Sequence, residues 1–190
     1  NGSADIAALP TNAAAALYNK TGGTVQVVAL NTRGVLYLVA DSSLEISSFE
    51  DLRGKTVYAP AQNPTFIFRY LCEANGLTPG KDVIIDNSYA QPADLNTAVS
   101  SGAVQLAVLP EPMVTIARSA NDKLTAALDL TAEWDKVAPA GSLVQGCAVV
   151  RREFAEAHPA ELACFLNEYK ASVEALSADI QGSAEKIQET

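Results

Sequence analysis

The sequence predicts an α/β protein, and three observations lead to this fold class. Apolar, β-branched segments alternate along the chain with segments whose apolar residues recur at helical spacing. The strand-like segments are almost continuously apolar, which is typical of strands that are covered on both faces in a parallel sheet. A twelve-residue pattern that begins at Asn1 also recurs at Ser101. We therefore expect at least one parallel sheet flanked by helices.

Short apolar segments bounded by turn-forming residues are predicted to be strands. They are Asp5–Leu9, Thr24–Leu30, Gly34–Ala40, Lys55–Ala59, Asp82–Asp86 and Gln105–Leu109. Helices are predicted between them at Asn12–Tyr18, Thr65–Asn75, Ala93–Ser100 and Pro112–Arg118. Ser48 precedes Asp51 by three residues, an acidic variant of the capping box that predicts one helical turn before the strand at Lys55. A long amphipathic helix is expected after His158, with Pro159 in its first turn.

The repeat aligns "NGSADIAALPTN" with "SGAVQLAVLPEP". Matching positions are Gly2/Gly102, Ala4/Val104, Ala7/Ala107, Leu9/Leu109 and Pro10/Pro110. Each copy has a glycine, a buried strand, a proline at its carboxyl end and then a new helix, which predicts a duplicated α/β unit. Strand, helix, strand and helix precede the second copy but not the first. We therefore expect one lobe to lack its opening elements and the chain to be a fragment of a longer protein.

Composition excludes several classes of protein. The chain is 48% hydrophobic and 18% charged, with a net charge of -9 and a pI near 4.5. Nucleic acid is not an expected partner, because phosphate contacts need clustered Lys and Arg. Cys72 and Cys164 fall in apolar helical patterns and are expected to be buried, and the three cysteines form no metal-binding pattern. No cofactor, metal site or catalytic set is expected, since His158 is the only histidine.

Polar residues follow three of the predicted strands, where helices begin. In open α/β sheets ligands lie beyond the carboxyl ends of the strands, and unpaired amides at helix starts favour anions or polar acceptors. The stretch "YAPAQNPTFIFRYL" is one such corner, and an ordinary helix cap at Asn63 is the alternative explanation for it. The carboxylate of Glu111 either favours an amine or amidine or simply complements a helix dipole. Aromatic stacking by Tyr58, Phe66 or Tyr89 is also open, although core packing explains Tyr58 and Phe66 equally well.

Several segments together resemble the substrate-binding proteins of ABC importers. They are "GSADIAALPTNAAAALYNKTGGTVQVVALNTRGVLYLVA", "SSFEDLRGKTVYAP", "SGAVQLAVLPEPMVTIA" and "VVRREFAEAHPAELACFLNEYKASVE". The most similar branch takes up nitrate, sulfonates, taurine or thiamine pyrimidine precursors. The resemblance implies a two-lobe type II periplasmic-binding-protein fold, with a parallel or mixed sheet in each lobe and the first lobe incomplete. It also implies a solute site in a cleft between the lobes.

The resemblance further implies domain boundaries and solute contacts. Lobe I is expected at 1–40 and 144–190, lobe II at 51–118, and connecting segments near the hinge at 41–50 and 119–143. The hinge crossings are expected near Gly34–Ala40 and Val144–Arg151. Family contacts with the solute fall on Thr11, Asn12, Gln62, Asn63, Thr65 and Glu111.

The expected function is non-catalytic capture of a small polar or heterocyclic solute for delivery to an ABC transporter membrane permease. The expected location is extracytoplasmic, either periplasmic or as a lipoprotein anchored through a preceding segment. Two alternatives share the fold: the effector domain of a transcription regulator, and an enzyme of the pyrimidine-precursor or menaquinone-pathway type. A preceding helix-turn-helix would select the regulator, and measured turnover would select the enzyme.

Overall fold

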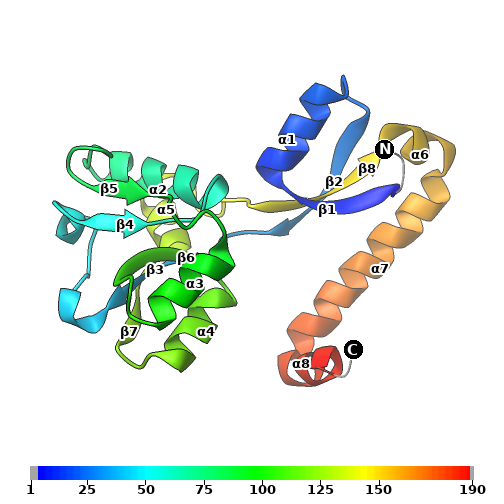
Figure 1. The fold of residues 1–190 in the computed structure, drawn as a ribbon. Coiled ribbons are helices and arrows are strands. Elements are labelled where there is room, and N and C mark those ends of the chain that lie inside the picture. The colour runs from blue at the N-terminus through cyan, green and yellow to red at the C-terminus, as the bar shows by residue number, and fades with distance from the viewer. Residues whose placement is uncertain (1–3, 189–190) are drawn as a thin grey trace. The chain divides into compact units, whose positions relative to one another are not determined.

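A computed structural model describes residues 4–188, which divide into two compact units (Figure 1). Unit 1 contains the residues up to Asn31 and those from Gly146 onward, and unit 2 is Thr32–Gln145. The chain therefore passes between the units after Asn31 and again before Gly146. These ranges differ from the expected lobes at 1–40, 144–190 and 51–118. The expected connecting segments 41–50 and 119–143 belong to unit 2, because strands and helices of that unit begin or end in them.

Unit 2 is built on a five-stranded mixed sheet with the order β5-β4-β6-β3-β7. The central strands β4 and β6 are parallel, and β4 is also parallel to β5, as the apolar segments predict. Strand β3 runs antiparallel to both β6 and β7, so the sheet is not parallel throughout. The strands are β3 (Leu36–Asp41), β4 (Thr56–Tyr58), β5 (Ile84–Asp86), β6 (Leu106–Pro110) and β7 (Leu124–Asp129).

Helices cover both faces of this sheet. Successive residues of β3 point to opposite faces, so Leu38 lies in the core under α2 (Asn63–Ala74) and α5 (Leu130–Val137). The next residue, Val39, lies in the core under α3 (Pro92–Ser100) and α4 (Met113–Ala120). Apolar helix residues complete the two cores: Phe68, Leu71, Leu130, Leu95, Val99, Val114 and Ala117. The two-layer cover explains why the strands of unit 2 are almost continuously apolar.

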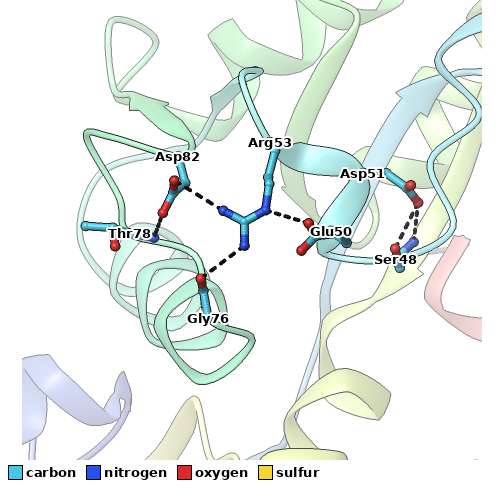
Figure 2. A network of polar contacts seen from close by, with 7 residues as sticks. All are labelled: Ser48, Glu50, Asp51, Arg53, Gly76, Thr78 and Asp82. Atoms are coloured by element: carbon cyan, nitrogen blue, oxygen red, sulfur yellow. Dashed lines mark hydrogen bonds and ion pairs between the residues drawn. The ribbon is translucent and has the colours of Figure 1, made fainter.

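A polar network lies at the edge of the sheet where β4 and β5 begin (Figure 2). Arg53 forms ion pairs with Glu50 and Asp82 and also donates to the carbonyl of Gly76, at 3.4 Å. The backbone N–H of Thr78 donates to Asp82 at 2.8 Å, and this bond is the main cause of the lowered pKa of Asp82. The network thus ties the turn before β4 to the end of α2 and to the segment before β5.

The predicted helical turn is confirmed, and the carboxylate half of the predicted capping box forms. Asp51 lies in the short 3₁₀ helix Glu50–Leu52, and its Oδ2 accepts hydrogen bonds from both the N–H and the hydroxyl of Ser48, at 2.9 and 3.0 Å. Ser47 donates to the same oxygen in the same two ways, each at 3.0 Å. These bonds favour the carboxylate, with that from the Ser47 N–H the largest cause, and lower the pKa of Asp51.

Unit 1 is built on a three-stranded sheet with the order β1-β8-β2. Its strand β1 is antiparallel to β8, with Pro10 opposite Gly146. The partner β8 occupies the segment that was expected to be a hinge crossing. The elements of unit 1 are β1 (Ile6–Pro10), α1 (Thr11–Lys20), β2 (Val25–Thr32), β8 (Gly146–Arg151), α6 (Arg152–Ala157), α7 (Pro159–Ala178) and α8 (Ile180–Gln188).

The core of unit 1 is small. Ala14 of α1 packs on Cys147 and Val149 of β8, with Ala7 and Leu9 of β1 at its border. Two grooves adjoin this sheet, of about 1090 Å³ and about 270 Å³, and Thr11 lines the smaller one. The long helix α7 forms as predicted, yet none of its described residues is buried. Cys164 on α7 is exposed, so its expected burial is wrong, whereas Cys72 in α2 is buried as expected.

The repeated pattern is followed by the same local structure in both copies. Pro10 ends β1 and Pro110 ends β6, and the helices α1 and α4 come next. Gly2, which the alignment matches to Gly102, lies outside the described residues.

Candidate functional site

Three strands of unit 2 end at one edge of the sheet, and the loops that follow them form the candidate site. The register places Tyr58, the last residue of β4, opposite Asp86 of β5 and Ala107 of β6. The loops 59–62, 87–91 and 111–112 therefore leave the sheet on the same side. Four residues that the sequence predicts to contact a solute lie in these loops or in the first turn of the helix that follows: Gln62, Asn63, Thr65 and Glu111.

Gln62 and Asn63 lie at the start of α2. Asn63 is the first helical residue, and Gln62 precedes it with φ 67° and ψ -124°. Residues other than glycine rarely adopt this left-handed backbone conformation. Gln62 makes no side-chain hydrogen bond to the helix start. An ordinary cap at Asn63 is therefore not what the structure shows. Gln62 is exposed and Asn63 is half-buried, so both can reach a bound molecule.

Thr65 is placed differently from what the sequence analysis expects. Its side chain is buried, with 7% of the residue exposed. The hydroxyl donates to the carbonyl of Pro60 at 2.7 Å and accepts from Nδ2 of Asn87 at 2.6 Å. Because its donor and one acceptor position are used inside the protein, Thr65 supports the loop rather than facing a solute.

Glu111 follows β6 at the start of α4. Its Oε2 accepts hydrogen bonds from the N–H and the hydroxyl of Thr115, at 3.2 and 2.9 Å. The side chain therefore complements the helix start, which is one of the two roles that the sequence left open. The peptide bond between Glu111 and Pro112 is cis, and the N–H of Glu111 donates to the carbonyl of Val35 at 2.9 Å.

Aromatic side chains lie next to these polar groups. The rings of Tyr58 and Tyr89 meet edge to face with centroids 5.9 Å apart. Both are half-buried against the core under α3 and α4, as are Tyr37 and Met113. Phe66, on the first turn of α2, is 59% exposed and is not part of the core. The edge thus offers both polar groups and ring surfaces.

The charge at this edge is mainly negative. Asp86 and Asp129 are the last residues of β5 and β7, and Glu111 follows β6. Arg33 precedes β3 and lies against Gly141. Burial raises the pKa of Tyr37, and the nearby carboxylates of Asp129 and Glu111 raise it further. Lysines and an arginine mark the opposite edge, before β4, β5 and β7: Arg53, Lys55, Lys81 and Lys123.

Asn87 is not among the residues that the sequence predicts to form the site. Its Nδ2 donates to Thr65 and also to the carbonyl of Ala59, at 2.8 Å. The sequence did contain a signal for Asn87, because this residue comes directly after the predicted strand Asp82–Asp86. Glu111 was selected because it also comes after a predicted strand. Only the fold shows that this side chain reaches the neighbouring loop.

Thr11 and Asn12 lie at the start of α1 in unit 1, where both are half-buried. No group of three or more His, Cys, Asp or Glu within residues 4–188 is placed to hold a metal ion. In the same range, every helix is too short or too polar to span a bilayer.

Comparisons with known proteins agree with this architecture. Residues 1–182 match the family model described as "ABC transporter, phosphonate, periplasmic substrate-binding protein". No curated protein has a significantly similar sequence. The solved structure of an ABC transporter protein from Parabacteroides distasonis is 24% identical and superposes with a TM-score of 0.77, covering 97% of this chain and 60% of its own.

Two sulfonate-binding proteins are also similar in structure. SsuA from Xanthomonas axonopodis pv. citri, an alkanesulfonate-binding protein solved with MOPS, is 16% identical with a TM-score of 0.70, covering 99% of this chain and 62% of its own. The periplasmic aliphatic sulphonate binding protein SsuA from Escherichia coli is 17% identical with a TM-score of 0.72, covering 96% and 59%.

At these identities the likenesses show the fold, and the chain spans about 60% of the length of the first of these structures. The fold is that of the binding proteins, as the sequence predicts. The family match covers nearly the whole chain. The chain belongs to the family of phosphonate-type periplasmic substrate-binding proteins of ABC transporters.

Proposed function

We propose that this protein captures a small polar or heterocyclic solute, without catalysis, for delivery to an ABC transporter membrane permease. The observation that carries the proposal is the family match over residues 1–182. The loops after β4, β5 and β6 support it, because they gather polar and aromatic side chains at the edge where α/β sheets bind ligands.

The proposed contacts divide by chemistry. Gln62 and Asn63 supply amide donors and acceptors at the start of α2. Because Thr115 binds Oε2 of Glu111, the other carboxylate oxygen can accept a hydrogen bond from an amine or amidine of the solute. Tyr58 and Tyr89 offer ring edges and faces to a flat heterocycle.

The negative balance of this edge favours a neutral or amine-bearing solute over a multiply charged anion, because a carboxylate repels an anion in a partly dry site. Thr11 and Asn12, at the equivalent corner of unit 1, remain proposed contacts by the family resemblance. Thr65 is not among the proposed contacts, because its hydroxyl is used within the loop.

The proposed location follows from the family, whose members are periplasmic binding proteins. Attachment to a membrane through a lipid anchor is a finer part of the same proposal. Metabolic labelling of the whole encoded protein with a radioactive fatty acid tests it, and an unlabelled protein would contradict it.

The central test is a thermal-shift screen of the whole encoded protein against sulfonates, phosphonates, nitrate, polyamines and aminopyrimidines. Titration calorimetry then gives the Kd of any solute that raises Tm. We expect a neutral or amine-bearing solute to raise Tm. We also expect the protein to leave that solute chemically unchanged. A protein whose Tm no member of the screen raises, or one that converts its solute, would contradict the proposal.

Asn63→Ala tests the contact at α2. We expect it to weaken binding by about 1–3 kcal/mol, the usual cost of leaving a buried polar partner unpaired. Asn75→Ala is the matched control, because Asn75 lies at the other end of the same helix. An unchanged Kd in Asn63→Ala, or an equal loss in the control, removes Asn63 from the site.

A further inference from the structure

The loop between β4 and α2 contains a strained residue. Gln62 has φ 67° and ψ -124°, a combination that is easy for glycine and costly for a residue with a Cβ. Glu45, the other non-glycine residue with positive φ among residues 4–188, lies in the common left-handed helical region with ψ 44°. Strain of this kind persists only where the surroundings hold it, and it gathers at ligand-binding sites.

A polar clamp, in which Thr65 is buried and Asn87 is exposed, holds the loop that leads to this residue. It consists of the Thr65 hydroxyl with its two partners, the carbonyl of Pro60 and Nδ2 of Asn87, and we name it the Thr65 clamp. Asn87 also donates to the carbonyl of Ala59. Side chains from α2 and from the loop after β5 thereby bind two consecutive carbonyls of the 59–62 loop, just before Gln62.

Backbone hydrogen bonds hold the loop on both sides of the clamp. Ala59 donates to the carbonyl of Asp86 at 2.9 Å, and Ala61 donates to that of Ala90 at 3.1 Å. On the helix side, Phe66 donates to the carbonyl of Gln62 at 2.9 Å. The loop is therefore attached by backbone hydrogen bonds to the last residue of β5 and to Ala90 in the loop that follows β5.

Two other helix starts at this edge, those of α4 and α5, are held by simpler means. Glu111 binds the first turn of α4, and Asp129 binds that of α5, each within its own segment. At α2, in contrast, the side chain of Asn87 from the loop after β5 bonds to the segment before the helix, and Gln62 in that segment has a positive φ. This arrangement does more than cap a helix, because a cap needs neither Asn87 nor strain at Gln62.

We propose that Thr65 and Asn87 are positioning residues that hold Gln62 and Asn63 in their binding conformation before the solute arrives. The inference rests on the proposed function, since it assigns the clamp a role in that same site. Holding a loop in its bound shape strengthens binding, because less order has to be created when the solute binds. Neither side chain needs to touch the solute.

The first test compares Thr65→Val with Thr65→Ser. Valine keeps the shape of threonine but lacks the hydroxyl, whereas serine keeps the hydroxyl and loses a methyl group. In the whole protein we expect Thr65→Val to raise the Kd of the screened solute about 10- to 100-fold, and Thr65→Ser to stay within about threefold. Equal Kd values for the two variants would overturn the proposal.

The second measurement needs no solute. Hydrogen exchange of the Ala61 and Gln62 amides should be at least about tenfold faster in Thr65→Val than in Thr65→Ser, with exchange in β3 and β6 unchanged. Acceleration throughout unit 2 would instead indicate a merely structural role and would overturn the proposal. If the natural protein binds nothing in the screen, the proposed function fails, and unchanged loop exchange would separately reject the clamp.

Gln62→Gly completes the test. Glycine adopts the observed backbone angles without strain. With glycine at position 62, the conformation of the loop should therefore depend less on the Thr65 clamp. In a double-mutant cycle we expect Thr65→Val to accelerate loop exchange less in the Gln62→Gly background than in the natural one. Strictly additive effects would show that the clamp does not act on the conformation of Gln62.

Discussion

Unit 1 and the matching half of unit 2 contain the same strand order but differ in burial. The order β1-β8-β2 in unit 1 corresponds to β6-β3-β7 in unit 2. In each, a strand that ends in proline lies antiparallel to the middle strand, with Pro10 opposite Gly146 and Pro110 opposite Leu36. The repeated sequence pattern is thus a repeated topology.

The difference lies in what surrounds the equivalent strands. In unit 2, β4 and β5 extend the sheet beyond β6, and helices cover both faces, so Leu106–Leu109 are all buried. In unit 1, β1 is an edge strand, and none of Ile6–Pro10 is fully buried. Similar sequence patterns therefore yield different burial, because burial depends on neighbours that the local sequence does not specify.

The consequence is an uneven distribution of stabilising contacts. The two cores of unit 2 contain most of the fully buried apolar side chains, and the core of unit 1 contains Ala14, Cys147 and Val149. On α7, apolar residues such as Val173 and Leu176 are about half exposed, at 52% and 47%. Unit 2 should therefore be the more stable part of the chain.

The largest expected effect is on the core of unit 2. Phe68→Ala should lower the free energy of unfolding by about 3–5 kcal/mol, because it removes a fully buried ring and leaves a cavity. Phe165→Ala, which removes a half-buried ring from α7, should cost less than about 1 kcal/mol. Urea unfolding of the chain measures both, and equal costs would show that α7 is as tightly packed as α2.

The next expectation concerns the buried thiols. Burial, with a smaller contribution from Glu73, raises the pKa of Cys72 to about 12, and burial raises that of Cys147, so both react only when the structure opens. Cys147 should be alkylated at least about tenfold faster than Cys72, which corresponds to about 1.4 kcal/mol less free energy of opening.

Mass spectrometry after timed alkylation measures the two rates. Exposed Cys164 should react first and serves as the internal reference. In denaturant the three thiols should react at similar rates. Native rates for Cys147 that equal or fall below those of Cys72 would contradict the lower stability of unit 1.

The smallest expected effect is on the capping box of unit 2. Asp51→Asn should lower Tm modestly at pH 7, because the carboxylate accepts hydrogen bonds from Ser47 and Ser48. The pKa of Asp51 is below its ordinary value of 3.8 in the folded protein. Its contribution is therefore present above that value and lost as the pH falls through the folded pKa.

The Tm difference between the natural chain and Asp51→Asn should accordingly shrink between pH 7 and pH 3. Asp122→Asn, at an exposed acid before β7, is the matched control and should change Tm little at either pH. A difference that grows on acidification would contradict the role of Asp51.

Local sequence predicted much of the secondary structure. The segment Thr65–Asn75 is helical because its apolar residues share one face, and Asp51 caps its turn because the partners lie only three residues away. The role of Thr65 could not be predicted from local sequence. Its partner Asn87 is 22 residues distant, so nothing in the local pattern indicates that the hydroxyl is buried and used.

The bounds of the two units, which differ from those of the expected lobes, and the exposure of Cys164 have one cause in common. Strand β3 belongs to unit 2 because β6 and β7 pair with it, and those strands lie far along the chain. Cys164 lies in an apolar helical pattern, yet none of the described residues of α7 is buried. A helical pattern indicates which residues share a face, and it does not specify what covers that face.

For this protein, the order of residues alone determined the α/β alternation, the duplicated strand–proline–helix corner and the resemblance to binding proteins. These depend on spacing of a few residues, which backbone geometry converts directly into helices, strands and turns. The tertiary structure alone decided which loops meet at one edge, that Asn87 holds the loop before α2, and that β1 is an edge strand whereas β6 is buried. Those outcomes depend on pairing between distant segments, whose free energy is realised only when the whole sheet forms.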